Sequence, residues 1–501
     1  MKMKAKATAL VIAIIAGVAA VCWADGWETV GGNSQRNGLS LLVGPTYPEI
    51  FWEDSQSAWF GGQIYIEGDK LVSMRFQGIS VAPIVCHDLY TGEELWSFDF
   101  EGTNSRSVPR GFRDGQIYAT NFQETGHDTL YALNPLDGDI IWRSQKTVDL
   151  GIVWAVVYDS AGNIIIPGSN AHLAKIDKTN GHIIWDIPRS QPNTGAEGVC
   201  VYGNTVYGWT GYLNTPKVIS AWDINDGHLK YSSATLPGDG DQEISPSIGP
   251  DGTIYAKRDG GNLYALRDNG SGIAILWDIP LAGDGYTAQF AIAADSSIYV
   301  PDGTTLVRLN PLNGAILNRS EELISSPPLC ARITIDSEGH IYAINGAAEE
   351  GALYFLTPSL EITAIEPLPY NYYSGPALGD LGCLAVAGNN NSLKVFNTFI
   401  GVQRGETRPQ HFSLSQNYPN PFNPSTNINY YLESECRVTL IVFNTLGQQV
   451  KKLADETQQS GAHSVTWDGR DEIGAEVTSG IYLYRLETET GSQTFKMTLM
   501  R

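Results

Sequence analysis

Three acidic residues alternate with other residues on a glycine-rich stretch of the chain. Asp239, Asp241 and Glu243 follow Pro237 and Gly238 in this stretch. Carboxylate oxygens are the ligands that Ca²⁺ prefers in proteins. The stretch lacks the complete pattern of a calcium-binding loop, and a solvated acidic loop between repeats explains the same residues. Asp239, Asp241 and Glu243 are therefore candidate calcium ligands, with the solvated loop as the alternative.

Histidines and cysteines form no pattern of a catalytic or metal site. The eight histidines are solitary, and the chain has no zinc-protease, nucleophile-elbow or phosphate-loop motif. We expect His87 to pack within a strand, and His182 and His228 to lie in solvated turns. Five cysteines beyond the N-terminal segment are widely separated, so we expect buried free thiols and leave one disulfide open: Cys86, Cys200, Cys330, Cys383 and Cys436. The sequence predicts no catalytic residue.

The elements that would position these residues repeat along the chain. One copy begins at Ile117-Tyr118, continues with an apolar strand over 130–133 and ends at Trp142. Short stretches rich in Val, Ile and Tyr, joined by turns with Asp-Gly or Asn-Gly, are typical of hairpins. A repeat of 42 to 46 residues built in this way predicts one propeller blade per copy. This spacing separates six turn glycines: Gly92, Gly138, Gly181, Gly227, Gly272 and Gly314.

The repeat predicts a closed ring. Its last copy lacks a Trp strand, whereas Ile50-Phe51-Trp52 resembles a Trp strand with no repeat before it. We expect this early strand to complete the last blade, because closure removes exposed sheet edges. The Trp and Tyr residues at equivalent positions are expected to pack between blades rather than bind sugars. Eight copies of an opening strand predict an eight-bladed β-propeller, with seven blades as the alternative: Ile64-Tyr65, Ile117-Tyr118, Ile164-Ile165, Val206-Tyr207, Ile254-Tyr255, Ile298-Tyr299, Ile341-Tyr342 and Leu384-Ala385.

Composition favours a large, acidic, all-β protein. The chain has 501 residues, only 17% of them charged, and a net charge of −22. The length allows two or three domains. The acidity disfavours nucleic acid and anionic membranes as partners.

The first residues have the pattern of a secretory signal peptide. Lys2, Lys4 and Lys6 precede an apolar run from Ala9 to Val21, which is short for a membrane span. We expect cleavage after residue 24, so that residues 1–24 are a signal peptide and no integral membrane span remains. Lipidation of Cys22 is the alternative.

The last ninety or so residues predict a second all-β domain. A linker at 401–410 separates the predicted propeller, residues 25–400, from this domain at 411–501. Short strands alternate with polar turns, which is typical of a small antiparallel sandwich. The expected strands lie at 430–432, 438–443, 464–467, 481–486 and 495–499. Because three prolines interrupt 419–424, this part is expected to be a crossover rather than a central strand.

Both parts resemble known families. The repeat around Ile117 to Trp142, and the segment Trp27 to Gly38, resemble pyrroloquinoline-quinone-type (PQQ-like) propellers over about Trp27 to Gly401. The final domain resembles the C-terminal sorting domain of type IX secretion cargo, with a generic Ig-like module as the alternative. The motif residues that carry this second resemblance are Asn417, Pro419, Asn420, Pro421, Phe422, Asn423, Pro424, Gly447, Trp467, Asp468, Gly469, Gly480 and Tyr482.

The resemblances imply a secreted or cell-surface protein that passes through the periplasm and contacts the type IX machinery. Quinone dehydrogenases of the propeller family carry adjacent cysteines, calcium ligands and a catalytic Asp in contexts that this chain does not match. We therefore expect a noncatalytic scaffold that binds a protein or polysaccharide and needs no cofactor, with calcium left open. The alternative is a propeller enzyme, either a quinone-type oxidoreductase or a polysaccharide-processing enzyme.

Overall fold

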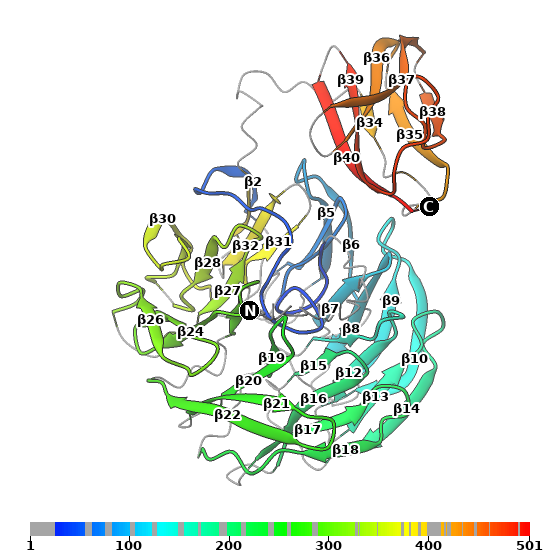
Figure 1. Cartoon of the computed structure of the whole chain (residues 1–501). Helices are drawn as coiled ribbons and strands as arrows, with labels where there is room; N and C mark the ends of the chain where they lie inside the picture. The colour runs from blue at the N-terminus through cyan, green and yellow to red at the C-terminus, as the bar shows by residue number, and fades with distance from the viewer. Residues whose placement is uncertain are drawn as a thin grey trace, which may run out of the picture. The chain divides into compact units, whose positions relative to one another are not determined.

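The computed structural model divides the chain into two compact units, Met1–Thr398 and Phe399–Arg501, which are described separately (Figure 1). It describes residues 26–500 except for 56–62, 76–82, 101–105, 123–127, 149–154, 169–171, 190–197, 212–216, 239–244, 258–261, 283–288, 326–328, 330, 348, 372–374, 380–381, 389–391, 398–411, 415–416, 418–421, 433, 445–447, 460 and 489–490. The predicted signal peptide and the linker at 401–410 lie outside the described residues. Among the described residues no helix is long and apolar enough to span a membrane.

The described part of the first unit contains eight antiparallel sheets, here numbered 1 to 8. Sheet 1 contains β1 (Gly26–Trp27), β3 (Tyr65–Glu67), β4 (Lys70–Met74), β5 (Ile84–Asp88) and β6 (Glu94–Phe98). Sheet 2 contains β7 (Arg106–Arg113), β8 (Gln116–Phe122), β9 (Asp128–Leu133) and β10 (Ile140–Val148), and sheet 3 contains β11 (Val157–Tyr158), β12 (Ile164–Gly168), β13 (His172–Ile176) and β14 (Ile183–Pro188). Sheet 4 contains β15 (Val199–Tyr202), β16 (Thr205–Thr210), β17 (Val218–Asp223) and β18 (Leu229–Ser232).

The remaining sheets continue in chain order. Sheet 5 contains β19 (Ser247–Ile248), β20 (Thr253–Lys257), β21 (Asn262–Asp268) and β22 (Ile273–Pro280). Sheet 6 contains β23 (Ala291–Ile292), β24 (Ile298–Asp302), β25 (Thr305–Leu309) and β26 (Ile316–Arg319), and sheet 7 contains β27 (Arg332–Ile335), β28 (Ile341–Ile344), β29 (Ala352–Leu356) and β30 (Ile362–Pro367). Sheet 8 contains β31 (Ala377–Leu378), β32 (Leu384–Gly388), β33 (Ser392–Phe396) and β2 (Ile50–Asp54). The predicted β-propeller is confirmed as the architecture, and the eight-blade count stays a prediction.

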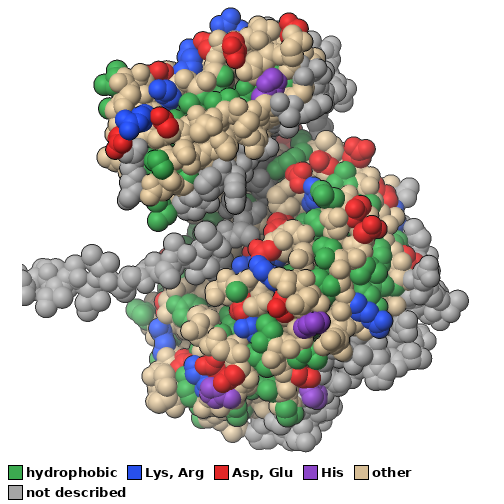
Figure 2. All heavy atoms as spheres, turned by 90° about the vertical axis from the view of Figure 1, so that its right-hand side faces the viewer, with side chains coloured by type: hydrophobic (Ala, Val, Ile, Leu, Met, Phe, Trp, Pro, Cys, Tyr) green, Lys and Arg blue, Asp and Glu red, His purple; other side chains and the backbone are tan. Residues whose placement is uncertain are grey.

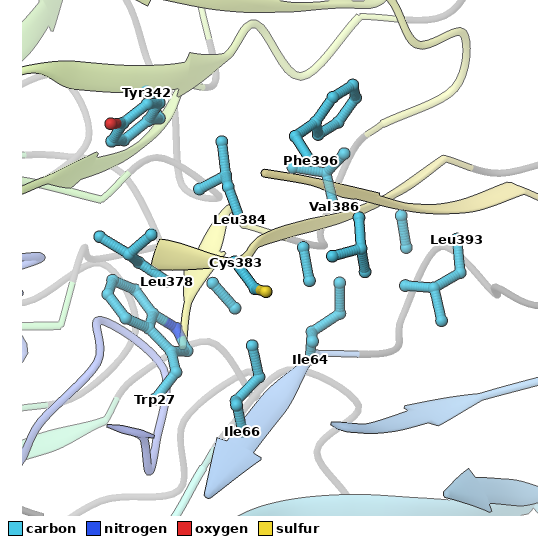
Figure 3. Packing of buried hydrophobic residues seen from close by; sticks show 14 of the residues in the cluster. Trp27, Ile64, Ile66, Tyr342, Leu378, Cys383, Leu384, Val386, Leu393 and Phe396 are labelled. Atoms are coloured by element: carbon cyan, nitrogen blue, oxygen red, sulfur yellow. The ribbon is translucent and has the colours of Figure 1, made fainter. Parts of the chain in front are cut away.

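The early strand β2 completes sheet 8, as the sequence predicted. It pairs with β33, where Ile50 faces Phe396 and Asp54 faces Leu393. The joint between sheets 8 and 1 is filled by buried apolar side chains (Figure 3). Ile64, directly before β3, and Ile66 on β3 approach Leu384 and its neighbours on sheet 8 there. Segments more than 300 residues apart in the chain therefore share one hydrophobic core.

Trp side chains of one sheet dock on the turn of the next sheet. Gly138 has φ +80°, and a Cβ on it would lie 2.8 Å from Trp96 Cε3. The Trp96 indole Nε1 donates to Pro135 O at 2.9 Å in the same turn. Glycine is therefore required both by the backbone and by the close approach of the ring. The same contact joins Trp52 with Gly92, Trp142 with Gly181, Trp185 with Gly227 and Trp277 with Gly314.

Two details of the repeat differ from the prediction. Ile64-Tyr65 does not open sheet 1 in the expected register, since Tyr65 lies on the strand before it, and Leu71-Val72 of β4 occupies that place. Gly272 receives no neighbouring side chain, and the positive φ of its turn belongs to Gly270. The preceding sheet carries Tyr231 in place of Trp, and its hydroxyl donates to Asp268 at the start of this turn.

A β-bulge lies just before the Trp position on the outermost strand of the sheets. In β10 the register shifts between Ile140 and Trp142, so Ile141 has no partner across the strand pair. Ile141 is exposed, as is Ile184 at the same place in β14. Figure 2 shows the apolar side chains on this side of the propeller among acidic and basic ones. A bulge twists an exposed edge and discourages pairing with another chain.

The second unit is a two-sheet sandwich and confirms the predicted Ig-like fold. One sheet contains β34 (Phe412–Leu414), β35 (Thr426–Leu432) and β38 (Gly461–Trp467); the other contains β36 (Cys436–Asn444), β37 (Gln449–Gln458), β39 (Gly480–Thr488) and β40 (Gly491–Leu499). Inward residues of both sheets form one core that includes Ile428, Val442 and Tyr484. All five predicted strand segments lie within these strands.

Candidate functional site

The segment from residue 27 to residue 44 follows the inner ends of the propeller sheets. It enters from β1, which pairs with β3 of sheet 1. Its carbonyls then accept backbone hydrogen bonds from the first strands of successive sheets: Glu28 O from Phe112 N at 3.0 Å, Ser34 O from Val201 N at 2.7 Å, Gln35 O from Ile248 N at 2.9 Å, Asn37 O from Ile292 N at 2.8 Å and Gly38 O from Ile335 N at 2.7 Å. Thr29 Oγ1 also donates to Val156 O beside β11. The segment thus contacts sheets 2 to 7 in order.

Side chains of this segment add to its attachment. Arg36 Nε donates to Val199 O at 2.7 Å, and its Nη2 donates to Ala155 O at 2.8 Å. Asn37 Nδ2 donates to Ile248 O at 3.2 Å. Because first strands of two to four residues have few partners of their own, these bonds satisfy main-chain groups that would otherwise be unpaired in the interior. The segment is therefore held against the inner ends of sheets 3 to 5.

Three buried arginines act electrostatically on one buried tyrosine near the axis. Arg36, Arg110 and Arg332 are 2%, 0% and 6% exposed, and Tyr65 is 1% exposed. Burial lowers the pKa of Arg36 to about 10. Burial also raises the pKa of Tyr65, and the charges of the three arginines oppose that rise. We call Tyr65, Arg36, Arg110 and Arg332 the axial arginine cluster.

A small pocket adjoins this cluster. It has an empty volume of about 190 Å³, part of it open to solvent, and its lining includes Trp27, Gln63, Gln289 and Arg332. This space has no room for a water-sized guest, so the pocket is a narrow crevice in the structure.

A second charged group lies where the ring closes. Asp54 Oδ2 of β2 is 3.0 Å from His87 Nε2 and 3.4 Å from Arg75 Nη2. Arg75 Nη2 is also 2.7 Å from Glu94 Oε2. His87 is buried as expected, and burial lowers its pKa. The group joins β2 to sheet 1 and contains no nucleophile for His87 to activate.

Glu28, in the N-terminal segment, is a third charged residue whose pKa is shifted. Its carboxylate lies 3.0 Å from Arg113 Nη1 on β7. Burial raises the pKa of Glu28 to about 7, although Arg113 opposes that rise. The carboxyl belongs to the N-terminal segment, so its charge state is linked to how that segment is held.

The candidate calcium ligands Asp239, Asp241 and Glu243 lie outside the described residues. Within the described residues no group of three or more His, Cys, Asp or Glu side chains is arranged to hold a metal ion. Cys86, Cys200 and Cys383 are buried free thiols, and Cys436 is half-buried; Cys330 is outside the described part. Burial raises the pKa of Cys86 and of Cys200 to about 12, which makes both poor nucleophiles. His182 and His228 are exposed in turns.

Most described motif residues of the final domain build its core. Trp467 is fully buried, and its ring centroid lies 5.5 Å from that of Phe422 and 5.2 Å from that of Tyr482. Asn417 is buried, and its backbone N donates to the Tyr484 hydroxyl at 2.7 Å. Gly469 is also buried, with a φ of +69°. These residues explain why the motif accompanies the fold.

The exposed motif residues are fewer. Asn423, Pro424, Asp468 and Gly480 face solvent. Pro419, Asn420, Pro421 and Gly447 lie outside the described residues. A partner that reads this motif directly would have exposed groups such as these four available.

Sequence reasoning missed the axial arginine cluster. Arg36 lies within a segment that the sequence singled out, but Tyr65, Arg110 and Arg332 carry no motif. In the fold they share a position on an inner strand of their sheets, in β3, β7 and β27. That signal becomes visible once the first strand of each sheet is known.

Comparison with known proteins agrees with the two folds. The family model for the outer membrane protein assembly factor BamB matches residues 80–207 and 126–290, and the model for the FlgD Ig-like domain matches residues 422–492. No curated protein matches the chain.

Solved structures of propellers are similar at low identity. BamB from Moraxella catarrhalis has a TM-score of 0.51 at 14% identity, with 69% of this chain and 99% of that chain covered. Quinohemoprotein alcohol dehydrogenase from Comamonas testosteroni has a TM-score of 0.58 at 13% identity, with 79% of this chain and 83% of that chain covered. Quinohemoprotein alcohol dehydrogenase ADHIIG from Pseudomonas putida HK5 has a TM-score of 0.54 at 11% identity, with the same shares of the two chains covered. Identities this low show the fold alone.

Proposed function

We propose that this protein is a secreted or cell-surface binding scaffold without catalytic activity, exported by the type IX system through its final domain. The observation that carries the scaffold proposal is the N-terminal segment at the axis. It gives its carbonyls to the first strands of successive sheets and leaves a small pocket beside Arg332. An axial segment of this kind stabilises the ring and competes for space with an axial cofactor.

The fold supports a scaffold as well as an enzyme. The same propeller architecture serves BamB, described as an outer membrane protein assembly factor, and quinohemoprotein dehydrogenases. The residues that repeat most clearly here, the Trp and turn glycine of each docking contact, join neighbouring sheets rather than line a site. The ligand is proposed to bind the loops at the ends of the sheets, as a protein or polysaccharide surface.

Export through the final domain is supported by the order of its motif and by its compactness. It is a separate unit with its own core, and such a unit can fold and be read independently of the propeller. A secretion machine that handles folded cargo needs an address of this kind.

The decisive experiment deletes residues 412–501 in a host that has a type IX system. The truncated protein should remain in the periplasm with a folded propeller, while the full chain reaches the surface or medium. Residues 412–501 fused to a passive periplasmic reporter should export it, and the same fusion carrying Trp467→Ala, which damages the domain core, should not. Normal export of the truncated chain would contradict the proposal and leave the domain as an appended Ig-like module.

A further inference from the structure

Exposed aliphatic side chains lie on the outer strands of sheets 5 and 6 and on the turn between β25 and β26. Ile275 and Leu276 of β22, and Ile316 and Leu317 of β26, are each 40% to 50% exposed. Leu312, in the turn, is 86% exposed. The register shifts in both strands, so Leu276 and Leu317 have no partner across the strand pair. Each bulge therefore presents two consecutive aliphatic side chains to solvent.

These side chains belong to one surface, because the outer strand of sheet 5 docks on the turn of sheet 6. The Trp277 indole Nε1 donates to Pro311 O at 2.8 Å, and a Cβ on Gly314 would lie 2.8 Å from Trp277 Cε3. Trp277 directly follows Leu276, and Pro311 directly precedes Leu312, so this contact brings the two leucines to the same part of the rim. β22 and β26 lie on the same side of the propeller in Figure 1. We give the name rim patch to Ile275, Leu276, Leu312, Ile316 and Leu317.

The rim patch lacks the charges that the same stretch of chain carries in other sheets. No charged residue occurs at 269–277 or at 309–318, although the chain has a net charge of −22. The exposed pairs Ile140-Ile141 and Ile183-Ile184 of sheets 2 and 3 occupy the same bulge, but charged residues stand near them in the sequence. Sheets 1 to 4 carry these charged residues at the matching positions: Glu93 and Glu94, Asp137 and Asp139, Lys178, and Asp226 and Lys230.

The area of the rim patch is large enough to matter for association. Its five side chains expose apolar surface on the order of 400 Å², within the range of about 300–600 Å² at which patches on monomers are often functional. Two copies that cover the patch would bury about 800 Å² through these side chains alone, about half of a standard interface of about 1,600 Å². Residues around the patch would supply the rest. This size predicts weak and reversible association.

We propose that the rim patch is the contact surface of a homodimer, in which the same patch of a second copy covers it. A two-fold interface requires only that the patch complements itself, and an uncharged aliphatic surface meets this condition. Elsewhere two copies with a net charge of −22 repel each other, whereas this patch brings no like charges together. Because the bulges disfavour pairing of the outer strands, side-chain packing supplies the contact. The proposal concerns the rim of the propeller and does not depend on what its loops bind.

Sedimentation equilibrium of the full chain tests this inference. We expect a reversible monomer–dimer equilibrium with a dissociation constant of about 10–100 μM, as for interfaces at the low end of the size range. Added salt should tighten the dimer, because it screens the repulsion between acidic copies. Leu276→Asp and Leu312→Asp should each weaken dimerisation at least about tenfold, since each places an unpaired charge in an apolar contact. The matched controls in sheet 2, Ile141→Asp and Leu136→Asp, should leave the dissociation constant unchanged.

A milder pair of variants exchanges the charge of two equivalent turns. Asn313 Oδ1 accepts from Ala315 N at 3.0 Å, and Asp137 Oδ1 accepts from Asp139 N at the same distance in sheet 2. Asn313→Asp therefore keeps the turn and adds only a charge beside Leu312. It should weaken the dimer, whereas Asp137→Asn should not.

The Tm of every variant should stay close to that of the parent chain, because only exposed side chains change. Loss of the dimer at an unchanged Tm supports the inference. It is overturned if the full chain is a monomer at about 200 μM, a concentration above the expected dissociation constant. It is also overturned if Leu276→Asp and Leu312→Asp leave a dimer intact. A monomer that floats with phosphatidylcholine vesicles, and loses flotation in Leu312→Asp, would show that the rim patch contacts lipid instead of a second copy.

Discussion

Trp52 of β2 packs against Gly92 in the turn between β5 and β6. A Cβ on Gly92 would lie 2.7 Å from Trp52 Cδ2, and the Trp52 indole Nε1 donates to Leu89 O at 2.7 Å. This is the docking contact of the propeller repeat, made here between the last sheet and the first. This contact near residue 50 therefore links the last sheet of the propeller, which extends to residue 396, to the first sheet.

Truncation of the Trp52 side chain should weaken the whole propeller. Trp52→Ala removes the indole from the Gly92 turn and leaves Leu89 O without its donor. We expect a loss of up to about 3 kcal/mol in the free energy of unfolding, measured by urea denaturation. The control is Phe51→Ala on the exposed bulge beside it, which should change stability by less than about 0.5 kcal/mol. Equal effects of the two variants would show that closure does not depend on the docking contact.

Much of the propeller was readable because its signal repeats. Trp strands and turn glycines recur with one period, so even the isolated Trp52 could be assigned to the last sheet. The first strands were not predicted, because β11, β19, β23 and β31 have two residues each and too few side chains for a pattern. For the same reason Tyr65 was assigned to the wrong strand of sheet 1.

Two other features were not predicted from the sequence, for different physical reasons. β37 was missed because Lys, Asp, Glu and Gln dominate its sequence and half of its residues face solvent. The axial arginine cluster was missed because Arg36, Arg110 and Arg332 are brought together only by ring closure. A buried arginine is read from sequence as a surface residue, since arginine is seldom buried.

Glu28 predicts that stability declines as the pH rises from about 4.5 to about 7. Burial raises its folded pKa to about 7 from an ordinary value of 4.5. The folded state then holds the proton more tightly, so the stabilising contribution is complete below pH 4.5 and lost as the pH passes through 7. Glu28→Gln should remove a decline of about 1–3 kcal/mol across this window, measured by urea denaturation. An unchanged pH slope in the variant would contradict this.

The lowered pKa of His87 predicts the opposite change of stability with pH. Burial lowers its folded pKa below the ordinary 6.5, although Asp54 and Glu94 favour the charged form and Arg75 opposes it. The folded state binds this proton less tightly, so the contribution is present above pH 6.5 and lost as the pH falls through the folded pKa. His87→Gln should reduce the acid sensitivity of the propeller and keep a donor for Asp54. Greater acid sensitivity in His87→Gln would show that the imidazolium is stabilised in the fold.

The core of the final domain predicts a separate effect of two neighbouring motif residues. Trp467→Ala opens a cavity between Phe422 and Tyr482 and should cost about 3–5 kcal/mol. Asp468→Ala removes an exposed side chain and should change stability by less than about 0.5 kcal/mol. Calorimetry of the full chain should show the loss in one transition only. Matching losses for both variants would mean that the motif turn, rather than the core, holds the sandwich together.

The axial segment predicts that the propeller does not take a quinone cofactor. A quinone at the axis would have to displace main chain that is hydrogen-bonded to the first strands of sheets 2 and 4 to 7, or fit into an empty volume of about 190 Å³. Each displaced carbonyl would leave a buried N–H unpaired, at a cost of about 1–3 kcal/mol per group. The full chain incubated with pyrroloquinoline quinone and calcium should therefore show no saturable quenching of quinone fluorescence and no dye-linked oxidation of alcohols or sugars. A quinohemoprotein alcohol dehydrogenase reconstituted in parallel provides the positive control. Stoichiometric quinone binding would show that the segment can leave the axis, and the scaffold proposal would then give way to an oxidoreductase.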